Sequence, residues 1–179
     1  CQKRPQRLFE ERELSVDECA GYLQKAINLL KSQTAASGSS EGTLKVIITV
    51  SPIRYAKYGY HGSQLSKATL LLAADKLVKE NPGVVSYFPA YEIMNDELRD
   101  YRFYKEDMLH PSEQAVEYIW ERFRTIYFGK AAEQFLEDWR PIREALGHKP
   151  FHPESEEHQK FIARTEEKKR QFEEKYHLL

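Results

Sequence analysis

The sequence predicts an α/β protein built around a parallel sheet, because strand-like and helix-like segments alternate along the first 128 residues. Two short apolar runs rich in β-branched residues, at 44–52 and 84–93, flank an amphipathic segment at 65–80. This order is typical of a βαβ unit. Two strands alone leave backbone groups unpaired, so we expect this region to be the second half of a larger, doubly wound domain.

The first helix is predicted to begin at Ser15, where Ser15 and Glu18 have the spacing of a capping box. Apolar residues then recur at helical intervals and form one stripe. The following segment, "SQTAASGSSEG" at 32–42, is expected to be a surface linker. The stripe consists of Val16, Cys19, Leu23, Ile27 and Leu30.

The run "LKVIITVSP" at 44–52 does not alternate in polarity, which predicts a parallel strand covered on both faces. A polar and aromatic loop is expected at 53–64, then a helix at 65–80 that ends at Asn81-Pro82-Gly83. The run "VVSYFPAYEI" is a second predicted strand, interrupted by a proline. Residues 94–109 are expected to form a short helix and a loop.

A further helix is predicted from Pro111 to Phe128, with proline at its first position and acidic residues in its first turn. Residues 129–179 form a predicted C-terminal extension that is helical and strongly charged, with a break at 147–153. The predicted division is therefore an α/β portion at 1–128 and a charged helical extension at 129–179.

Composition excludes several classes of function. A net charge of −1 gives no basic field for general nucleic-acid binding. No apolar run approaches the roughly 20 residues that a membrane-spanning helix needs. Cys1 and Cys19 form neither a disulfide framework nor a metal-ligand pattern, and we expect no cofactor. Because the chain begins at Cys1, targeting information is expected to lie upstream, which leaves the compartment open.

Candidate site residues lie in the two polar segments that follow the predicted strands, since open parallel sheets bind ligands beyond their carboxyl ends. Asp107 and His110 follow the second strand, and His110 lies near the predicted helix N-cap. They have the acid–base spacing of a hydrolytic triad, but the same pattern serves as a turn and a helix cap. The segment after the first strand supplies four candidate substrate-binding residues: Arg54, His61, Ser63 and Gln64.

Each of the other candidates has an ordinary structural interpretation. The pair Ser66-Lys67 has the chemistry of a serine–lysine catalyst, but a lysine on an amphipathic helix usually belongs to the solvated face. Likewise His61, beside a glycine, is more often a structural hydrogen-bonding residue than a catalyst. Tyr55, Tyr58 and Tyr60 suit a sugar-binding surface or a loop packed over the sheet edge.

Four segments resemble the C-terminal part of the GSCFA family, a bacterial family similar to the SGNH/GDSL hydrolases. They are "TVSPIR", "HGSQLSKATLLLA", "FPAYEIMNDELRDYRFYKEDMLHPS" and "AVEYIWERF", and the likeness extends over about residues 1–128. The resemblance implies part of a three-layer, flavodoxin-like sheet of the SGNH type. The family usually has His-Gly-Asn-Gln where this chain has His61-Gly62-Ser63-Gln64, so Ser63 is a departure.

In SGNH hydrolases the last conserved block, D-x-x-H, supplies the acid and base of the triad, and it resembles Asp107-Met108-Leu109-His110 here. The nucleophilic serine lies in an N-terminal block, which in this family is Gly-Ser-Cys-Phe-Ala. That block and the superfamily's oxyanion-hole residues have no counterpart in these 179 residues. The resemblance therefore implies a chain that carries two members of a triad and is inactive alone.

Two functions follow as hypotheses. The first is a serine ester hydrolase acting on an acylated carbohydrate or another small ester, with Asp107 and His110 as catalytic residues and no metal. The alternative is a non-catalytic carbohydrate-binding or scaffold protein that keeps the same frame. The first strand would have an exposed edge, so we also expect pairing with the missing N-terminal segment or with a second copy.

Overall fold

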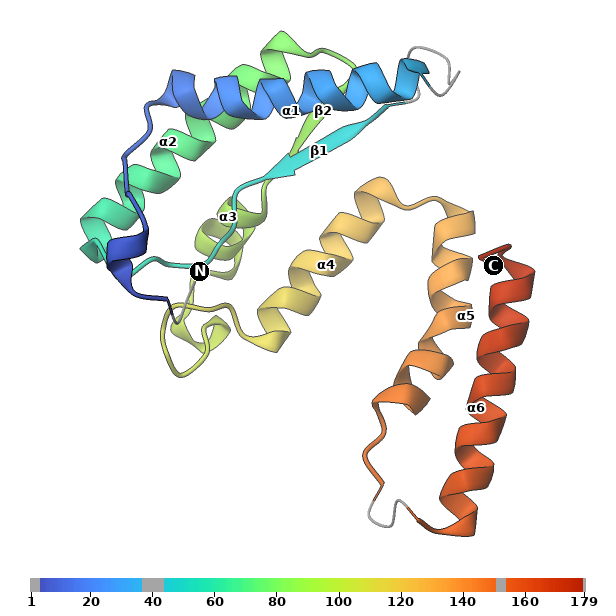
Figure 1. Ribbon diagram of the computed structural model, residues 1–179. Helices are drawn as coiled ribbons and strands as arrows, with labels where there is room; N and C mark the ends of the chain where they lie inside the picture. The colour runs from blue at the N-terminus through green and yellow to red at the C-terminus, as the bar shows by residue number, and fades with distance from the viewer. Residues whose placement is uncertain (1–3, 37–43, 151–153, 179) are drawn as a thin grey trace. The chain divides into compact units, whose positions relative to one another are not determined.

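The computed structural model describes residues 4–36, 44–150 and 154–178 (Figure 1). It divides into two compact units, Cys1–Trp120 and Glu121–Leu179, and the boundary falls inside one helix. The first unit is α/β and the second is helical. The main elements are α1 (Val16–Ala36), β1 (Val46–Thr49), α2 (Gly59–Glu80), β2 (Val85–Phe88), α3 (Ala90–Glu92), α4 (Glu113–Tyr127), α5 (Lys130–Gly147) and α6 (Glu156–Lys175). Short turns of 3-10 or π-helix lie at Gln6–Leu8, Ile93–Leu98 and Tyr101–Phe103.

The predicted parallel pairing is confirmed: β1 and β2 form a two-stranded parallel sheet, in which Val46 pairs with Val85 and Thr49 with Phe88. The connection between the strands is α2, as the βαβ pattern indicates. The prediction that β1 is covered on both faces is wrong, because Ile47 is 38% exposed and Thr49 is also exposed. Alternating burial of this kind is typical of a strand covered on one face.

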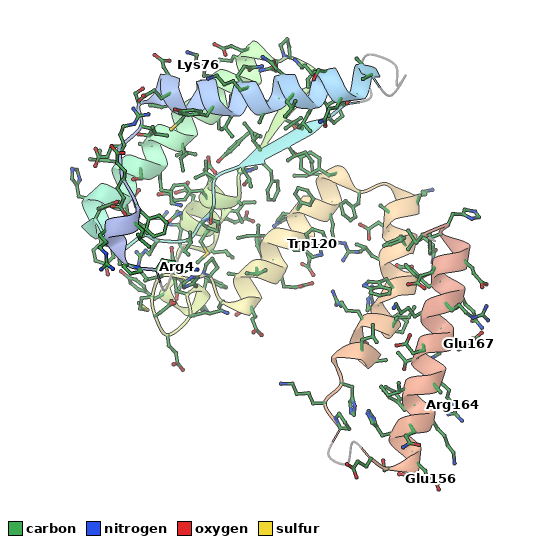
Figure 2. The ribbon with its side chains drawn as sticks, in the orientation of Figure 1. Arg4, Lys76, Trp120, Glu156, Arg164 and Glu167 are labelled. Carbon is green, nitrogen blue, oxygen red and sulfur yellow. The ribbon has the colours of Figure 1, made fainter. Side chains whose placement is uncertain are left out.

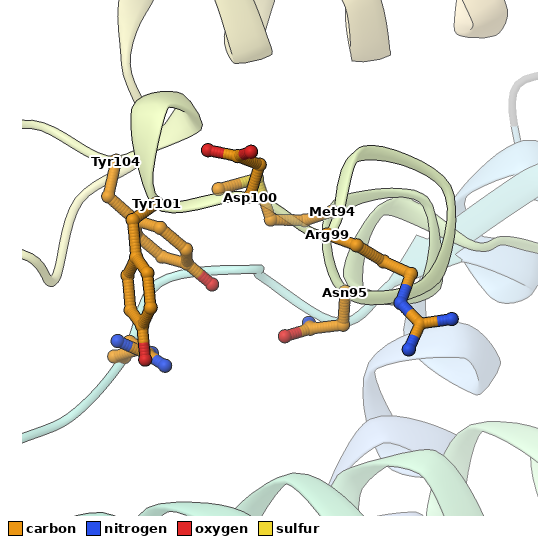
Figure 3. Close-up of a pocket in the computed structure, with 7 residues that line it drawn as sticks. Met94, Asn95, Arg99, Asp100, Tyr101 and Tyr104 are labelled. Carbon is orange, nitrogen blue, oxygen red and sulfur yellow. The ribbon is translucent and has the colours of Figure 1, made fainter.

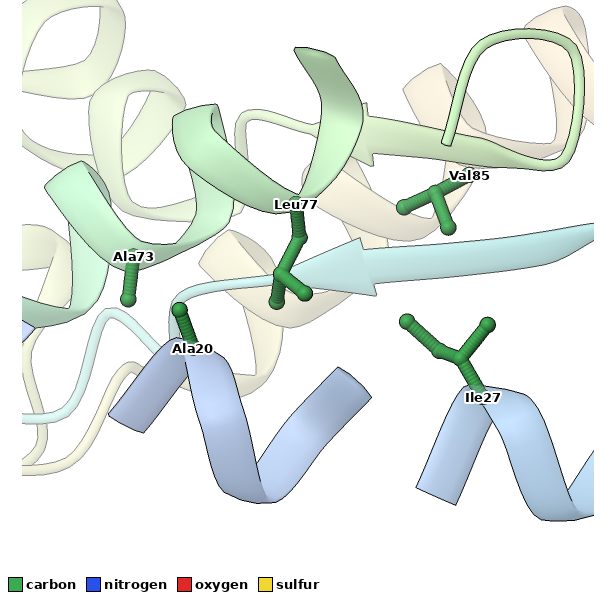
Figure 4. Packing of buried hydrophobic residues seen from close by; sticks show 5 residues of the cluster. All are labelled: Ala20, Ile27, Ala73, Leu77 and Val85. Atoms are coloured by element: carbon green, nitrogen blue, oxygen red, sulfur yellow. The ribbon is translucent and has the colours of Figure 1, made fainter. Parts of the chain in front are cut away.

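Helices α1 and α2 cover one face of the sheet and form the main core with it (Figure 4). Small residues allow the two helices to approach closely, and larger aliphatic side chains fill the space above the strands. The core consists of Ala20 and Ile27 from α1, Ala73 and Leu77 from α2, and Val85 from β2. Of the predicted stripe on α1, Ile27 is buried, whereas Leu23 and Leu30 stay more than 40% exposed.

A buried asparagine joins the end of α2 to α1. The side-chain oxygen of Asn81 accepts hydrogen bonds from Gln24 and Lys31, and its amide nitrogen donates to Gln24 and to the carbonyl of Leu77. Its donors and acceptor are thus satisfied, as a buried polar group requires. The predicted stop at Asn81-Pro82-Gly83 is confirmed, and Gly83 has a φ of +75° that favours glycine.

The boundaries of several elements differ from the predictions, among them those of α1, α2 and β2. Helix α1 extends to Ala36, so residues 32–36 are helical, and residues 37–42 of the predicted linker lie outside the described residues. Helix α2 begins at Gly59, six residues before the predicted start at 65. Strand β2 ends at Phe88, because Pro89 begins a run of short helical turns.

The second unit contains a pair of helices, α5 and α6, joined by aromatic packing. Phe135 of α5 packs edge-on against Phe172 and Tyr176, with ring centroids 4.9 and 4.7 Å away, and Trp139 lies 5.1 Å from Phe172. The remaining surface of α6 is strongly charged, and residues such as Arg164 and Glu167 are exposed (Figure 2). This agrees with the helical, strongly charged extension predicted at 129–179.

Candidate active site

The site is built on a tight hairpin that precedes α4. Tyr104 and Pro111 form an isolated antiparallel bridge, and Lys105 N donates to the carbonyl of His110 over 2.8 Å. Met108 N donates back to the carbonyl of Lys105 over 2.9 Å, which closes the turn. These bonds place Asp107 and His110 on one short, well-defined loop rather than on a mobile connection.

The centre of this turn is held in an unfavourable backbone conformation. Met108 has a φ of +59°, in the left-handed region that side chains with a β-carbon rarely adopt. The conformation turns the chain so that the amides of Leu109 and His110 both point at Asp107. Strain of this kind persists only where the surrounding contacts impose it, and it is frequent at functional sites.

The carboxylate of Asp107 is the centre of the hydrogen-bond network. Its Oδ1 accepts from the amides of Leu109 and His110, each at 2.9 Å, and its Oδ2 lies 2.5 Å from His110 Nδ1. The two backbone amides and the imidazole lower the pKa of Asp107 to about 2. The side chain is therefore ionised at neutral pH and acts as a fixed anionic acceptor for the ring.

His110 is oriented but not buried. Its side chain is 54% exposed, and among the described residues its Nε2 atom has no hydrogen-bond partner. The helix predicted to start at Pro111 begins instead at Glu113, and the Ser112 hydroxyl caps it by accepting from the amide of Ala115, so His110 lies two residues before the cap. One ring nitrogen is thus held by Asp107 while the other faces solvent.

A second tether joins this hairpin to the segment that follows β1. Arg54 N donates to the carbonyl of Leu109 over 3.0 Å, and Arg54 Nη1 donates to the carbonyl of Met108 over 3.3 Å. Because this segment leaves the carboxyl end of β1, the hairpin lies at the end of the sheet where parallel α/β proteins bind ligands. Two polar segments that are distant in the sequence therefore meet in one place.

The Arg54 guanidinium is surrounded by aromatic rings. Its Cζ lies 4.7 Å from the ring centroid of Tyr104, 5.5 Å from that of Tyr60 and 5.7 Å from that of Tyr101. Cation–π contacts of this kind hold the planar group without neutralising its charge. Beside it lies a cavity of about 210 Å³, lined by Arg54, Met94, Asn95, Arg99, Asp100, Tyr101 and Tyr104 (Figure 3).

Comparison with known families places these features in context. The sequence model of the GSCFA family matches residues 1–123, and that of the GSCFA domain protein, C-terminal domain, matches residues 139–179. The chain belongs to the GSCFA family. No curated protein and no solved structure matches it. This agrees with the resemblance seen in the sequence. The matched ranges include the hairpin and most of the α5–α6 pair.

The predicted substrate-binding residues of this GSCFA chain have different environments. Arg54 lines the cavity, whereas His61, Ser63 and Gln64 lie in the first turns of α2 rather than in a loop. Ser63 is buried, and its hydroxyl accepts from the amide of Tyr55 over 3.2 Å. Gln64 accepts from the Tyr91 hydroxyl over 2.6 Å. His61 is exposed.

The prediction that Lys67 belongs to the solvated face of its helix is wrong. Its side chain is buried, and Nζ donates to the carbonyl of Ser51 over 2.6 Å, just beyond the end of β1. The ring of Tyr91 lies 5.8 Å from the same nitrogen. Burial lowers the pKa of Lys67 below its ordinary value. A serine–lysine pair with Ser66 finds no support, since Nζ is bound to a backbone carbonyl.

Of the seven residues that line the cavity, the sequence predicts only Arg54 as a site residue; the six others include Asn95, Arg99, Tyr101 and Tyr104. The sequence signal for these four residues is the density of charged and aromatic residues in "NDELRDYRFY", a segment whose pattern otherwise predicts a short helix and a loop. In the described part of the chain, no group of three His, Cys, Asp or Glu side chains is arranged to hold a metal ion. None of its helices is long and apolar enough to cross a membrane.

Proposed function

We propose that this GSCFA protein is an ester hydrolase in which His110 acts as the general base and Asp107 fixes the imidazole. The observation that carries the proposal is the 2.5 Å contact between Asp107 Oδ2 and His110 Nδ1, with Nε2 left facing solvent. An aspartate in this position selects the tautomer with the proton on Nδ1. The lone pair of Nε2 is then available to take a proton from a nucleophile.

The proposed reaction uses this pair twice. A serine hydroxyl attacks the ester carbonyl carbon while Nε2 accepts its proton, and Asp107 stabilises the imidazolium that forms. The imidazolium then gives the proton to the leaving alcohol oxygen as the carbon–oxygen bond breaks. Water repeats the sequence on the acyl-enzyme and releases the carboxylic acid. Asp107 remains ionised throughout, in keeping with its pKa of about 2.

The proposed nucleophile and oxyanion donors come from a polypeptide segment outside these 179 residues. Within the described ranges, no serine hydroxyl is hydrogen-bonded to His110 Nε2. Ser63, which stands where the family usually has asparagine, is buried, and its hydroxyl accepts a hydrogen bond from the amide of Tyr55. We propose that the whole domain is a three-layer sheet of the SGNH type, supported by the parallel βαβ unit and by a D-x-x-H turn that leads directly into a helix.

The proposed substrate is a small ester or an acylated carbohydrate. The cavity with its tyrosine rings is joined to the hairpin, because its lining residue Arg54 donates to the carbonyl of Met108 and its lining residue Tyr104 bridges to Pro111. Aromatic rings combined with arginine and amide groups suit a hydroxylated ring better than an aliphatic chain.

A fluorophosphonate probe tests this function in the complete natural polypeptide that contains this sequence. Attack of an activated serine on phosphorus expels fluoride and passes the serine proton to the base, so labelling requires a functional His110. We expect one labelled serine, located outside residues 1–179, and loss of labelling in His110→Ala but not in His61→Ala. No labelling of the natural polypeptide would favour the carbohydrate-binding alternative. Labelling of Ser63 would contradict the assignment of the nucleophile.

A further inference from the structure

The cavity beside the hairpin contains two positive charges without acidic partners. Arg54 is held by tyrosine rings and backbone carbonyls, and Arg99 has no hydrogen bond or ion pair from its side chain among the described residues. The one acidic residue in the wall, Asp100, is already engaged, since its carboxylate accepts from Arg102 N over 2.9 Å and lies 3.4 Å from the Arg102 guanidinium. The lining therefore has an excess of positive charge.

The backbone at Arg99 is a second sign that this side chain has a role. Arg99 has a φ of 50° and ends a π-helical turn by donating its amide to the carbonyl of Met94 over 3.2 Å. Glycine or asparagine is the usual residue at such a position, because a β-carbon is strained there. Arg99 and Met108 are two of three described non-glycine residues with positive φ, and both flank this site.

The remaining walls suit a ring that bears hydroxyl groups. Tyr101 and Tyr104 lie on one side of the cavity and Asn95 on the other, with its amide directed toward the space between them (Figure 3). The Asn95 nitrogen donates to the carbonyl of Tyr91 over 2.7 Å, which leaves its oxygen to accept from a ligand hydroxyl. A volume of about 210 Å³ matches a single ring rather than a drug-sized ligand.

We propose that this cavity binds an acidic monosaccharide unit, with its ring between the tyrosines and Asn95 and its carboxylate attracted by the positive charges of Arg54, on the tyrosine side, and Arg99, on the Asn95 side. Guanidinium is the group best suited to a planar carboxylate, because it offers paired N–H donors. The inference rests on the proposed function: it identifies the ester substrate as one attached to an acidic carbohydrate. Arg54 lines the cavity and donates to the carbonyls of Met108 and Leu109, so the proposed sugar site is tethered to the hairpin that carries His110.

The proposal is tested by NMR titration, which measures the binding of methyl glucuronide and of methyl glucoside to the 179-residue chain. The two probes share a ring and differ in the carboxylate. We expect the glucuronide to bind at least about tenfold more tightly, as a charge-assisted hydrogen bond to a carboxylate implies. Equal affinity for the two sugars, or tighter binding of glucose 6-phosphate than of the glucuronide, would overturn the acidic-sugar assignment.

Three variants locate the binding. Arg99→Gln should reduce glucuronide affinity about tenfold and leave glucoside affinity unchanged. Lys105→Gln removes an equal charge from an exposed hairpin residue outside the cavity lining, and it should change neither the glucuronide affinity nor the glucoside affinity. Arg99→Gly relieves the strained backbone, so its melting temperature should hold or rise while its affinity falls. Unchanged glucuronide affinity in both Arg99 variants would contradict the site.

Failure of this inference can be distinguished from failure of the hydrolase. Glucuronide binding without any esterase activity in the natural polypeptide would support the sugar site and overturn the proposed hydrolase function. Esterase activity without glucuronide binding would overturn only the acidic-sugar site.

Discussion

The carboxylate of Asp107 holds His110 at two points, through its backbone amide at 2.9 Å and through ring Nδ1 at 2.5 Å. Because the first contact fixes the backbone and the second fixes the ring, the imidazole has little freedom to turn Nε2 away from solvent. A residue that served only to end a turn would need the backbone contacts alone. The ring contact is what makes the hairpin a candidate catalytic element.

The same contacts make the hairpin sensitive to acid. Hydrogen bonds lower the pKa of Asp107 from its ordinary value of 3.8 to about 2, so the ionised form is favoured in the folded chain. The stabilisation is complete above about pH 4 and is lost as pH falls toward 2. A ¹³C NMR titration of the Asp107 carboxyl carbon, assigned with Asp107→Asn, should have its midpoint near 2. A midpoint near 4 would show that the network does not form in solution.

The strained turn predicts opposite effects for two substitutions at Met108. Met108→Gly should leave stability unchanged or raise it by up to about 1 kcal/mol, because glycine adopts positive φ without cost but gains freedom in the unfolded chain. Met108→Val should lower it by about 1–2 kcal/mol, since a β-branched residue disfavours this region. Urea unfolding measures both. Equal stability of the two variants would contradict the left-handed conformation.

The start of α1 offers a test of local structure. Ser15 and Glu18 form the predicted capping box: Ser15 N donates to the Glu18 carboxylate over 2.9 Å, and Glu18 N donates to the Ser15 hydroxyl over 3.2 Å. Ser15→Ala should lower stability by about 1 kcal/mol. Ser32→Ala, at an exposed position within the same helix, is the matched control and should change stability by less than about 0.5 kcal/mol. Similar losses in both variants would argue against the cap.

The open face and edge of β1 predict self-association of this chain. In the described residues β1 pairs only with β2, and Ile47 is 38% exposed on the uncovered face. An unpaired edge with apolar side chains favours pairing between copies. Sedimentation velocity should show a mass that increases with concentration, reduced by Ile47→Lys but not by Leu72→Lys on exposed α2. A monodisperse monomer at all concentrations would contradict this prediction.

Sequence patterns predicted the helix starts and ends that are determined by residues close together in the chain. The capping box at Ser15, the stop after Glu80 and the break between α5 and α6 all depend on residues that are neighbours in the chain. The early start of α2 at Gly59 was not predicted, because "YHGSQ" contains glycine and polar residues typical of a loop. Its buried Ser63, which accepts from Tyr55 N, is a tertiary contact that no local pattern contains.

The candidate site was predicted only in part for the same reason. The spacing of Asp107 and His110 indicated the pair, but their contact depends on positive φ at Met108, which the sequence gives no reason to expect from methionine. The union of Arg54 with Tyr101 and Tyr104 depends on the parallel pairing of two distant strands. Burial of Lys67 likewise follows from its contact with the end of β1, not from its place on a helix.

Ester hydrolysis by the complete natural polypeptide tests most directly whether Asp107 and His110 act as a catalytic pair. With p-nitrophenyl acetate, His110→Ala and Asp107→Asn should lower kcat by about 10³-fold or more, as removal of a triad member does. His61→Ala should retain activity within a few-fold, and the 179-residue chain alone should show none above background. Full activity in His110→Ala, or robust turnover by the isolated chain, would contradict the assignment of Asp107 and His110 as the acid–base pair of a triad completed by another segment.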